Sequence, residues 1–541
     1  MSQSPDHADV LVVGAGASGS VVAKTMAEAG FSVVCLEQGE WIEASDYASD
    51  KLEREILQEG RWHIDPNYRK RPEDYPCDVS ESAIHPVMFN AVGGSTIHYA
   101  GEWTRLLPSD FRVRTLDGVG DDWPIDYAEL APYYDRIEQM MGISAHPGDP
   151  AYPPMTPAPN PALPLGELGR FAAEGFNKLG WHWWPGYNAI ASRTHGRLSP
   201  CARRGTCMTG CPQGAKASVD ITIWPDAIAA GARLVTGARV SRITTNSAGL
   251  ATGAEWIDRN GVTHHQSADL VVLAGNGVGT ARLLHLSTSQ QFPDGLANRS
   301  GLVGKRLQLH PLATILGVYD TDLESWRGPF GESVTSSQFA ESDISRGFPR
   351  GARLTVMPIA GPVETLWRFA EVLPLEERSG PALHDLIRRS FGRSFEIAVS
   401  IDDLPNENNS VSLSTELVDG DGIPAPKIRW QPPEHAEKAL DWFSTRAEEF
   451  HRAAGATEVH RLDPGASVGW HLLGTARIGH DAETSVLDAF GRSHDVPNLA
   501  VVDGSTFVTS GSTNPTATIM AFALRAAEHL VKHARTQRIP V

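Results

Sequence analysis

The sequence predicts an α/β fold with two closely packed domains, and three observations predict it. The chain has 541 residues, more than one ordinary hydrophobic core accommodates. Residues 9–37 contain an apolar strand, a glycine-rich turn, a helix and a second strand. Residues 269–287 contain another buried strand that runs into a glycine-rich helix start. Strands that alternate with helices in this way are typical of a parallel sheet covered by helices.

The first of these stretches, "ADVLVVGAGASGSVVAKTMAEAGFSVVCLEQGE", predicts a Rossmann-like dinucleotide site. Gly14 permits the tight turn after the strand, Gly16 lets the backbone approach a pyrophosphate, and Gly19 lets the helix pack on the strand. Glu37 ends the second strand 23 residues after Gly14. Its carboxylate can accept hydrogen bonds from a ribose diol, which favours an unphosphorylated adenosine.

Two further stretches combine glycine-rich segments with helix starts. "FNAVGGSTIHYAGEW" at 89–103 precedes a predicted helix with an aromatic face at 121–144. "NLAVVDGSTFVTSGSTNPTATIMAFALR" at 498–525 contains a strand, the pair Asp503-Gly504, a loop and a helix that begins near Pro515. A helix start leaves backbone N–H groups unpaired and concentrates partial positive charge, and Asn514 stands at its cap.

The intervening segments predict a connector and a second domain. Residues 146–164 are dense in proline and are expected to be an extended connector. From about residue 310 to 464 the pattern changes to strands and one long amphipathic helix. Residues 406–430 are expected to form a hairpin, and their D-G-D-G stretch is a turn because its spacing does not suit a calcium loop.

These pieces, in this order and at these distances, resemble the glucose–methanol–choline family of flavin-dependent oxidoreductases, and the resemblance covers nearly the whole chain. It implies a discontinuous FAD-binding domain made of residues 1–130, 200–309 and 465–541. It also implies a substrate-binding domain made of residues 131–199 and 310–464, with a mostly antiparallel sheet backed by helices.

The resemblance implies which residues contact FAD. In this family the helix that starts near Pro515 points at the pyrimidine end of the flavin, where its partial charge favours the reduced form. His98 is expected to contact the flavin, and in certain sugar oxidases of the family a histidine here is the covalent attachment point. The implied contacts are Gly14, Gly16, Ala17, Ser18, Gly19, Glu37, Gly93, Gly94, Ser95, His98, Val240, Asp503, Gly504, Asn514, Pro515 and Thr516.

His471, in "GWHLLGTARIG", occupies the place where the family keeps its catalytic base. A neutral histidine can take the hydroxyl proton of an alcohol, and the alkoxide then releases a hydride to flavin N5. Asn514 is expected to hold the substrate oxygen. The implied reaction is oxidation of a CH–OH group, on a sugar or a glycoside, to the carbonyl. Tryptophans 181, 183 and 184 could stack on a sugar ring or pack a domain interface.

Three cysteines lie close together in "CARRGTCMTGCPQGAKAS". The spacing of Cys201, Cys207 and Cys211 is similar to the loop that binds a 3Fe-4S cluster in membrane-linked sugar dehydrogenases of the family. The same loop could instead pack beside the adenosine without iron. If the loop binds the iron–sulfur cluster, electrons would pass to a cytochrome.

Several functions therefore remain open from the sequence. FAD-dependent oxidation of a sugar or glycoside hydroxyl could pass electrons to oxygen or to a soluble carrier. An iron–sulfur dehydrogenase subunit, oxidation of an amino sugar or aminoglycoside hydroxyl, and a non-redox lyase are the alternatives. A lyase would leave the flavin absorbance unchanged when it is mixed anaerobically with alcohols.

Charge and hydropathy exclude other classes of protein. The formal net charge is −18, which argues against a nucleic-acid partner and would suit a cationic substrate, or simply solubility. No apolar run approaches the roughly 20 residues that span a bilayer. The N-terminal residues lack a basic segment followed by an apolar one, so a cytoplasmic location is expected.

Overall fold

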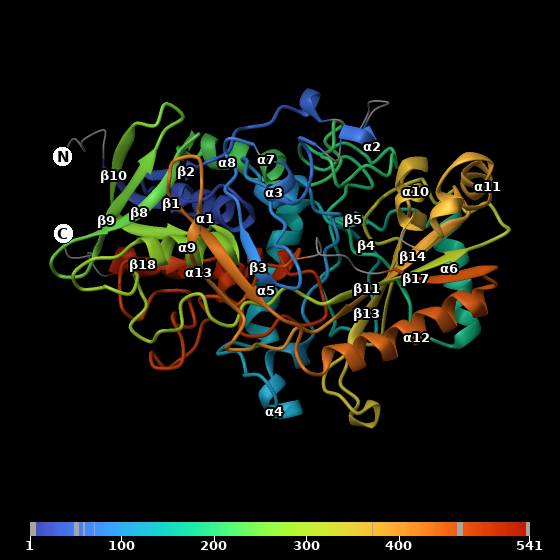
Figure 1. The fold of residues 1–541 in the computed structure, drawn as a ribbon. Helices are drawn as coiled ribbons and strands as arrows, with labels where there is room; N and C mark the ends of the chain where they lie inside the picture. The colour runs from blue at the N-terminus through green and yellow to red at the C-terminus, as the bar shows by residue number, and fades with distance from the viewer. Residues whose placement is uncertain are drawn as a thin grey trace.

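The computed structural model of the chain describes residues 7–47, 54–57, 60–69, 71–370, 372–462 and 469–536. The predicted domain limits at residues 1, 465 and 541 lie outside these ranges. Two large sheets dominate the molecule, one on the left and one on the right of Figure 1, which confirms the predicted α/β class.

The first sheet has seven strands in the order β7-β2-β1-β10-β9-β8, and β18 pairs with the end of β10. Strands β7, β2, β1, β10 and β18 are parallel, whereas β9 and β8 continue antiparallel. The strands are β1 (His7–Val13), β2 (Val33–Glu37), β7 (Arg233–Thr236), β8 (Arg239–Thr245), β9 (Ala251–Ile257), β10 (Thr263–Leu273) and β18 (Leu499–Val501).

This strand order creates a crevice at the carboxyl end of β1. The chain leaves β1 towards β2 on one side, and β10 lies on its other side, which makes β1–β10 the switch point of a doubly wound sheet. Gly14 follows β1 with φ of +103°, and a Cβ there would lie 2.6 Å from the carbonyl oxygen of Ala274, which follows β10. Glycine at this position therefore lets the two strand-to-helix turns approach each other.

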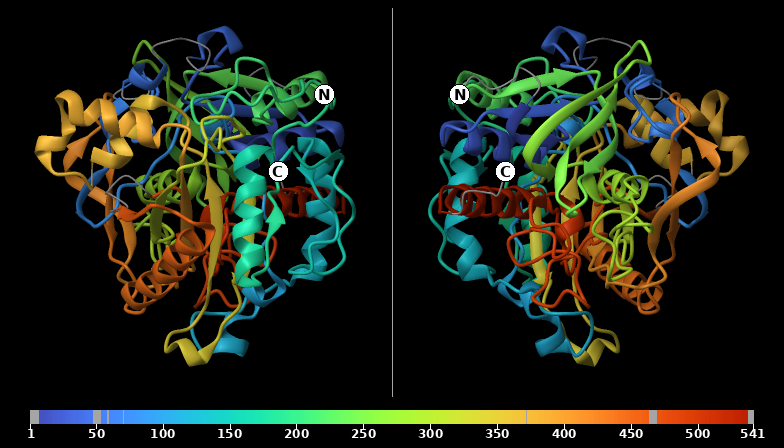
Figure 2. Two further views of the ribbon diagram at one scale, coloured as in Figure 1. Left: turned by 90° about the vertical axis from the view of Figure 1, so that its right-hand side faces the viewer. Right: turned by 90° about the vertical axis from the view of Figure 1, so that its left-hand side faces the viewer.

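Helices from distant parts of the chain cover this sheet. Helix α1 packs against α13, and α13 packs against α5. In Figure 2 the red α13 accordingly lies beside the blue N-terminal segment. Asp126 caps α5 by accepting a hydrogen bond from the Glu129 N–H, so the helix begins at Tyr127, inside the predicted range 121–144. These helices are α1 (Ala17–Glu28), α5 (Tyr127–Met141), α9 (Asn276–Leu286) and α13 (Thr516–Thr536).

The second sheet has six antiparallel strands in the order β17-β11-β14-β13-β12-β6. Helices α6 (Gly166–Leu179) and α12 (Ala436–Ala454) cover one face, where fully buried side chains such as Ile315, Ile397 and Val399 form a core with them. The strands are β6 (Trp184–Pro185), β11 (Leu312–Val318), β12 (Val334–Phe339), β13 (Ala352–Met357), β14 (Ser394–Ile401) and β17 (Glu458–Leu462).

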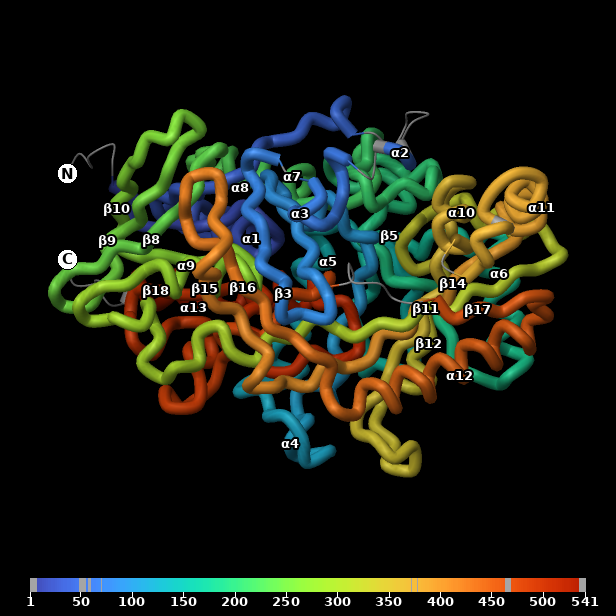
Figure 3. Tube along the Cα trace, in the orientation of Figure 1, coloured from blue at the N-terminus to red at the C-terminus, as the bar shows by residue number. Residues whose placement is uncertain are grey.

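The predicted hairpin is present as β15 (Ser410–Val418) and β16 (Pro424–Trp430), and β16 also pairs with β3 (Asp78–Ser82). In Figure 3 the orange hairpin lies next to the blue β3 segment. Asp419, in the D-G-D-G turn, forms buried ion pairs with Arg239 and Arg282. The turn therefore anchors the hairpin to the first sheet.

The remaining described elements are short, apart from α10 and α11 beside the second sheet. Within the proline-dense segment 146–164 the described structure has one two-residue strand and is otherwise irregular. None of the described helices combines the length and the apolar character needed to cross a bilayer. The further elements are α2 (Arg54–Leu57), α3 (Pro66–Arg69), α4 (Val113–Asp117), α7 (Val219–Thr222), α8 (Trp224–Ala229), α10 (Pro362–Ala370), α11 (Gly380–Ser390), β4 (Ser144–Ala145) and β5 (Asn160–Pro161).

Candidate active site

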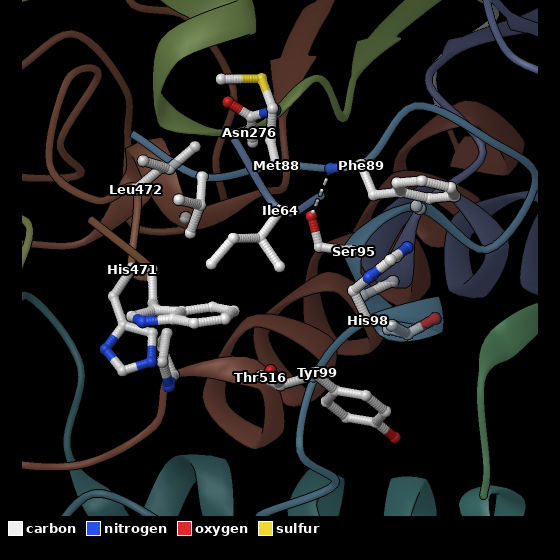
Figure 4. A pocket seen from close by; sticks show the side chains of 18 of the residues that line it. Ile64, Met88, Phe89, Ser95, His98, Tyr99, Asn276, His471, Leu472 and Thr516 are labelled. Atoms are coloured by element: carbon white, nitrogen blue, oxygen red, sulfur yellow. Dashed lines mark hydrogen bonds between the residues drawn. The ribbon is translucent and has the colours of Figure 1, made fainter. Parts of the chain in front are cut away.

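A large cavity of about 990 Å³ connects the glycine-rich turn after β1 with the face of the second sheet that α6 and α12 leave uncovered. Segments far apart in the sequence form its walls, and Figure 4 shows side chains from several of them around one open space. Cavities that bind small molecules reach about this size at the upper end of their range. The cavity therefore has room for a large ligand.

Most of the predicted cofactor contacts line this cavity. Gly19 and Gly93 do not appear in its wall. A Cβ on Gly19 would lie 2.0 Å from the Gly14 carbonyl oxygen, so Gly19 serves the predicted packing of helix on strand. The predicted contacts that line it are Gly14, Gly16, Ala17, Ser18, Glu37, Gly94, Ser95, His98, Val240, Asp503, Gly504, Asn514, Pro515 and Thr516.

Glu37 lies at the end of the cavity next to the turn after β1. Its carboxylate accepts hydrogen bonds from the backbone N–H groups of Ala15 and Gly39, each at 2.8 Å. Burial raises the pKa of Glu37 to about 7. A carboxylate has about four lone-pair sites, so two remain for hydroxyl groups of a ligand.

Hydrogen bonds to the Asp503 carboxylate hold the loop before α13 in place. The Asp503 carboxylate accepts hydrogen bonds from the Ser505 N–H and from the Thr280 hydroxyl of α9, at 2.9 and 2.6 Å. These bonds hold the 503–516 segment against the β10–α9 turn. The N-terminal N–H groups of α13 consequently face the cavity wall that Pro515 and Thr516 form.

His471 is held by a second histidine that sequence reasoning missed. His310 Nδ1 lies 2.6 Å from His471 Nδ1, and His310 Nε2 lies 2.5 Å from the Gly511 carbonyl oxygen. His310 is non-glycine with φ of +54°, an uncommon conformation that often marks a functional site. Burial lowers the pKa of both rings, for His471 well below its ordinary value, and both are therefore neutral near pH 7.

This contact chain determines which nitrogen of His471 carries a proton. The Gly511 carbonyl can only accept, so the single N–H of neutral His310 is on Nε2 and its Nδ1 is an acceptor. His471 must then donate from Nδ1, which leaves the lone pair on its Nε2. His471 Nε2 is consequently a proton acceptor beside the cavity.

Asn514 contacts a buried acidic pair. Its side-chain amide hydrogen-bonds Glu102, whose pKa burial and the charge of Glu332 raise to about 8. Burial also raises the pKa of Glu332 to about 7, and the nearby charge of Arg353 opposes both shifts. Arg353 in turn donates a hydrogen bond to the Tyr152 hydroxyl at 2.6 Å. Near neutral pH the pair keeps a proton, because two adjacent buried carboxylates resist double ionisation.

His98 lies on the side of the cavity opposite His471 (Figure 4). Its ring is 3% exposed, stacks obliquely at 4.1 Å from the Phe89 ring, and has a pKa that burial lowers well below its ordinary value. Neither ring nitrogen forms a hydrogen bond of ordinary geometry with a described residue, and the Met208 backbone is the polar group that approaches the ring. Unsatisfied buried nitrogens at a cavity wall indicate that a ligand completes the site.

The predicted iron–sulfur cluster is not supported. Among the described residues, which include Cys201, Cys207 and Cys211, no three side chains of metal-binding type are grouped to hold a metal ion. Two of the sulfur atoms instead accept hydrogen bonds from nearby backbone N–H groups. Cys201 Sγ accepts from the Arg203 N–H at 3.3 Å, and Cys211 Sγ accepts from the Ala215 N–H at 3.2 Å.

The cysteine loop packs against the segment that carries His98. Lys216 is 1% exposed and donates hydrogen bonds to the carbonyl oxygens of Cys207, Ile97 and Tyr99, at 2.5, 2.5 and 3.0 Å. Met208, next to Cys207, lines the cavity. The loop thus has a packing role beside the site.

The tryptophans of "GWHWWPGY" do not line the cavity. Trp181 and Trp183 pack against the core between the second sheet and its helices, and Trp184 lies in β6. The three rings therefore take no part in the wall of this cavity, and their contacts favour a packing role over stacking on a sugar there.

Sequence signals existed for the residues that were missed. Glu102 lies inside the glycine-rich stretch 89–103, where a buried acid is unusual. His310 precedes Pro311 at the predicted change of domain, and ligand sites occur preferentially at such boundaries. Neither signal indicates a partner, because His310 and His471 are 161 residues apart.

The chain is similar to one family of oxidoreductases over most of its length. Residues 170–312 and 405–523 match the two models described as GMC oxidoreductase. Residues 12–52 match a model described as NAD(P)-binding Rossmann-like domain.

Individual relatives extend this similarity to both ends. A 2-methyl-1,2-propanediol dehydrogenase of Mycolicibacterium austroafricanum is 41% identical over 98% of this chain and 96% of its own. A paromamine 6'-oxidase of Streptomyces fradiae is 32% identical over 96% of this chain and 90% of its own. A formate oxidase of Aspergillus oryzae, studied for modification of its FAD, shares the fold with a TM-score of 0.64 at 14% identity, over 100% of both chains.

Proposed function

We propose that this chain, which belongs to the glucose–methanol–choline (GMC) oxidoreductase family, is an FAD-dependent enzyme that oxidises a CH–OH group of a sugar, a glycoside or a related polyol to the carbonyl. One observation carries the proposal: a neutral histidine with a free Nε2 lone pair and the dinucleotide-type turn after β1 border the same cavity. The names of the relatives, a propanediol dehydrogenase and a paromamine oxidase, support an alcohol as the substrate.

The residues around the cavity fit FAD. Glu37 offers acceptors to the ribose diol, and the backbone N–H groups of Gly16 and the start of α1 suit the pyrophosphate. The α13 N-terminus and the unsatisfied ring of His98 suit the polar edge of a flavin. Held by these residues, FAD would supply the acceptor for the hydride that leaves the carbinol carbon.

His471 acts as the general base in this proposal. Its Nε2 takes the hydroxyl proton of the alcohol, and the resulting positive charge spreads over the His471–His310 pair towards the Gly511 carbonyl. The burial that lowers its pKa keeps it neutral, and therefore able to accept a proton, well below pH 6.5. Asn514 donates to the substrate oxygen and holds it beside Nε2, with Glu102 fixing the amide from behind.

Oxidation of an amino sugar or aminoglycoside hydroxyl is a second candidate within the same chemistry. The relative named paromamine 6'-oxidase favours it, and so does the net charge of −18, which attracts cationic substrates. Oxygen or a soluble carrier would reoxidise the cofactor, as the relatives include both an oxidase and a dehydrogenase by name.

An anaerobic flavin-bleaching screen tests the proposal. The purified holoprotein is mixed with sugars, glycosides, amino sugars and diols, and the loss of flavin absorbance is followed. We expect His471→Ala to slow bleaching by about 10² to 10⁴ while FAD stays bound. Absorbance that no alcohol changes would favour the non-redox lyase, and wild-type rates in His471→Ala would reject His471 as the base.

A further inference from the structure

Two adjacent acidic residues, Asp402 and Asp403, follow the last residue of strand β14 and lie behind the histidine pair. Their exposed fractions are 1% and 0%, and neither belongs to the wall of the active-site cavity. Aspartate is almost never fully buried unless it is paired with other groups. The partners of the two side chains therefore indicate what each of them holds in place.

Asp403 holds the backbone that carries His310. Its Oδ2 accepts hydrogen bonds from the Leu309 N–H at 2.6 Å and from the Trp430 indole N–H at 3.2 Å. The His310 N–H also approaches this carboxyl group. Because the left-handed φ of His310, +54°, costs free energy in a residue other than glycine, it persists only where the surroundings support it. The carboxyl of Asp403 provides that support at the turn itself.

Asp402 acts on His310 from the other side, through Ser510. The Ser510 hydroxyl donates a hydrogen bond to Asp402 Oδ1 at 2.8 Å, and hydrogen bonds to a carboxylate are stronger than those between neutral groups. Ser510 directly precedes Gly511, whose carbonyl oxygen accepts the hydrogen bond from His310 Nε2. The position of that carbonyl consequently depends on the bond between Asp402 and Ser510.

A buried arginine fixes Asp402 in turn. Arg350 Nε donates to Asp402 Oδ2 at 2.6 Å, and its two terminal nitrogens donate to Asp117 and Asp110. One guanidinium does not neutralise three carboxylates, so this cluster retains negative charge. The charge of Asp402 accordingly opposes the effect of burial on the pKa of His310. Negative charge held in place beside the pair stabilises the positive charge that forms when the base takes a proton.

We propose that Asp402 and Asp403 are positioning residues of the proposed reaction. Asp403 holds the left-handed backbone of His310. Asp402, acting through Ser510, holds the carbonyl that receives the His310 Nε2–H. Together they keep His310 Nδ1 facing His471, so that His471 Nε2 stays a proton acceptor. This inference rests on the proposed function and deepens it, because it assigns the tautomer of the base to two residues outside the cavity wall.

Nuclear magnetic resonance tests this assignment without turnover. The histidine nitrogens of the holoprotein are isotope-labelled, and the Nδ1–H signal of His471 is identified by its absence in His471→Ala. We expect the signal to be lost in Asp403→Ala and in Ser510→Ala, because His310 then no longer presents its acceptor. Asp403→Asn should keep the signal: the amide retains an oxygen acceptor, and Asp403 Oδ1 forms no hydrogen bond of ordinary geometry with a described residue.

Anaerobic flavin reduction supplies the kinetic test. Asp403→Ala and Ser510→Ala should each slow it by about 10- to 100-fold with KM within about twofold of the parent, whereas Asp403→Asn should stay within about threefold. A histidine in the wrong tautomer cannot take the proton, so hydroxide must remove it. The residual rate in the alanine variants should therefore rise about 10-fold per pH unit between pH 6 and 8, while the parent rate stays level.

The matched control is Thr509→Val, which loses two buried hydrogen bonds in the same loop without contacting the histidine pair. It should keep the pH profile of the parent. A parent-like His471 signal in Ser510→Ala, or the same loss of rate and the same pH profile in Thr509→Val and Ser510→Ala, would overturn the assignment, and Ser510→Ala keeps the test decisive if Asp403→Ala does not fold. Loss of the signal as expected, combined with a flavin that no alcohol bleaches, would instead reject the proposed function and leave the positioning of the histidine pair standing.

Discussion

The His310–His471 contact predicts a measurable effect of a residue that does not itself reach the cavity wall. His310→Ala would leave the Nδ1–H of His471 without its acceptor, so the tautomer with a free Nε2 would lose its support. Such orienting partners typically change activity by about 10- to 100-fold. We expect the rate of anaerobic flavin reduction to fall by that factor, with KM within about twofold of the parent.

The matched control for this variant is His384→Ala, at an exposed position of α11. Stopped-flow absorbance at saturating substrate separates the hydride-transfer step from product release. A His310→Ala enzyme that reduces its flavin at the parent rate would show that His471 needs no orienting partner.

A second residue, Glu102, predicts how the rate of flavin reduction depends on pH. Its pKa is raised to about 8, so the carboxyl is neutral at pH 7 and ionises as the pH rises through 8. The ionised form would hold the Asn514 N–H more tightly and place a negative charge beside a site that must receive a hydride. We expect the parent enzyme to lose flavin-reduction rate above pH 8.

Glu102→Gln mimics the neutral carboxyl and should abolish this alkaline decrease, while its rate at pH 7 stays within a few-fold of the parent. The rate of flavin reduction is measured for the parent and for Glu102→Gln over the same pH range. If the two profiles coincide above pH 8, the decrease belongs to another group and Glu102 does not control Asn514.

The loop that carries Cys201, Cys207 and Cys211 depends on one buried cation, the side chain of Lys216. Lys216→Met would remove the donor that the carbonyl oxygens of Cys207, Ile97 and Tyr99 share. Each buried acceptor left unpaired costs about 1 kcal/mol or more, so we expect the free energy of unfolding to fall by roughly 3 kcal/mol. Because two of these carbonyls flank His98, the affinity for FAD should fall as well.

Chemical denaturation and fluorescence titration with FAD measure the two effects, and Lys178→Met at an exposed position of α6 is the control. In the same preparation, metal analysis should find iron far below one equivalent. Stoichiometric iron with labile sulfide would restore the cluster that the arrangement of Cys201, Cys207 and Cys211 does not support.

The elements also show why some of the structure could be predicted from the sequence. The β1–α1–β2 unit and the hairpin β15–β16 each lie within a short stretch, and local patterns of glycine, apolar residues and turn residues determine them. The start of α13 carries its own cap and proline signals. For the site, the predicted residues that line the cavity lie mostly in these same turns.

The other contacts of the site could not be predicted from the sequence, because they depend on the tertiary arrangement. His310 approaches His471, and Glu102 approaches Asn514, only because segments far apart in the sequence meet at the cavity. The sequence also left the role of Trp181, Trp183 and Trp184 open, because an aromatic cluster does not show which face of a sheet it covers. The pairing of β11 with β14 likewise depends on a register between residues far apart in the sequence, such as Leu312 and Ser400, which are 88 residues apart.

At the scale of the whole molecule, buried titratable groups of two kinds determine how stability depends on pH. Burial raises the pKa of Glu332 and Asp403 to about 7, so the folded protein keeps protons that the unfolded chain releases above its carboxyl pKa of about 4. Stability from these groups is therefore lost as the pH rises. Burial lowers the pKa of His471 and, to about 4, that of His451, so below about pH 6.5 the unfolded chain binds protons that the folded protein does not.

The buried carboxyls and the buried histidines together predict that the free energy of unfolding is greatest at a pH somewhat below 7. Above pH 6.5 the histidines are neutral in both states and only the carboxyl effect remains, so the free energy of unfolding should fall between pH 6.5 and about 8. It should level off once Glu332 and Asp403, whose pKa is about 7, have ionised in the folded protein. Urea titrations at constant ionic strength measure it, on apoprotein and holoprotein separately because Glu37 and His98 face the cofactor cavity. Glu332→Gln removes one ionisation without adding a charge and should flatten the decrease. Stability that does not fall between pH 6.5 and 8 would mean that these buried carboxyls are already ionised in the folded protein at pH 6.5.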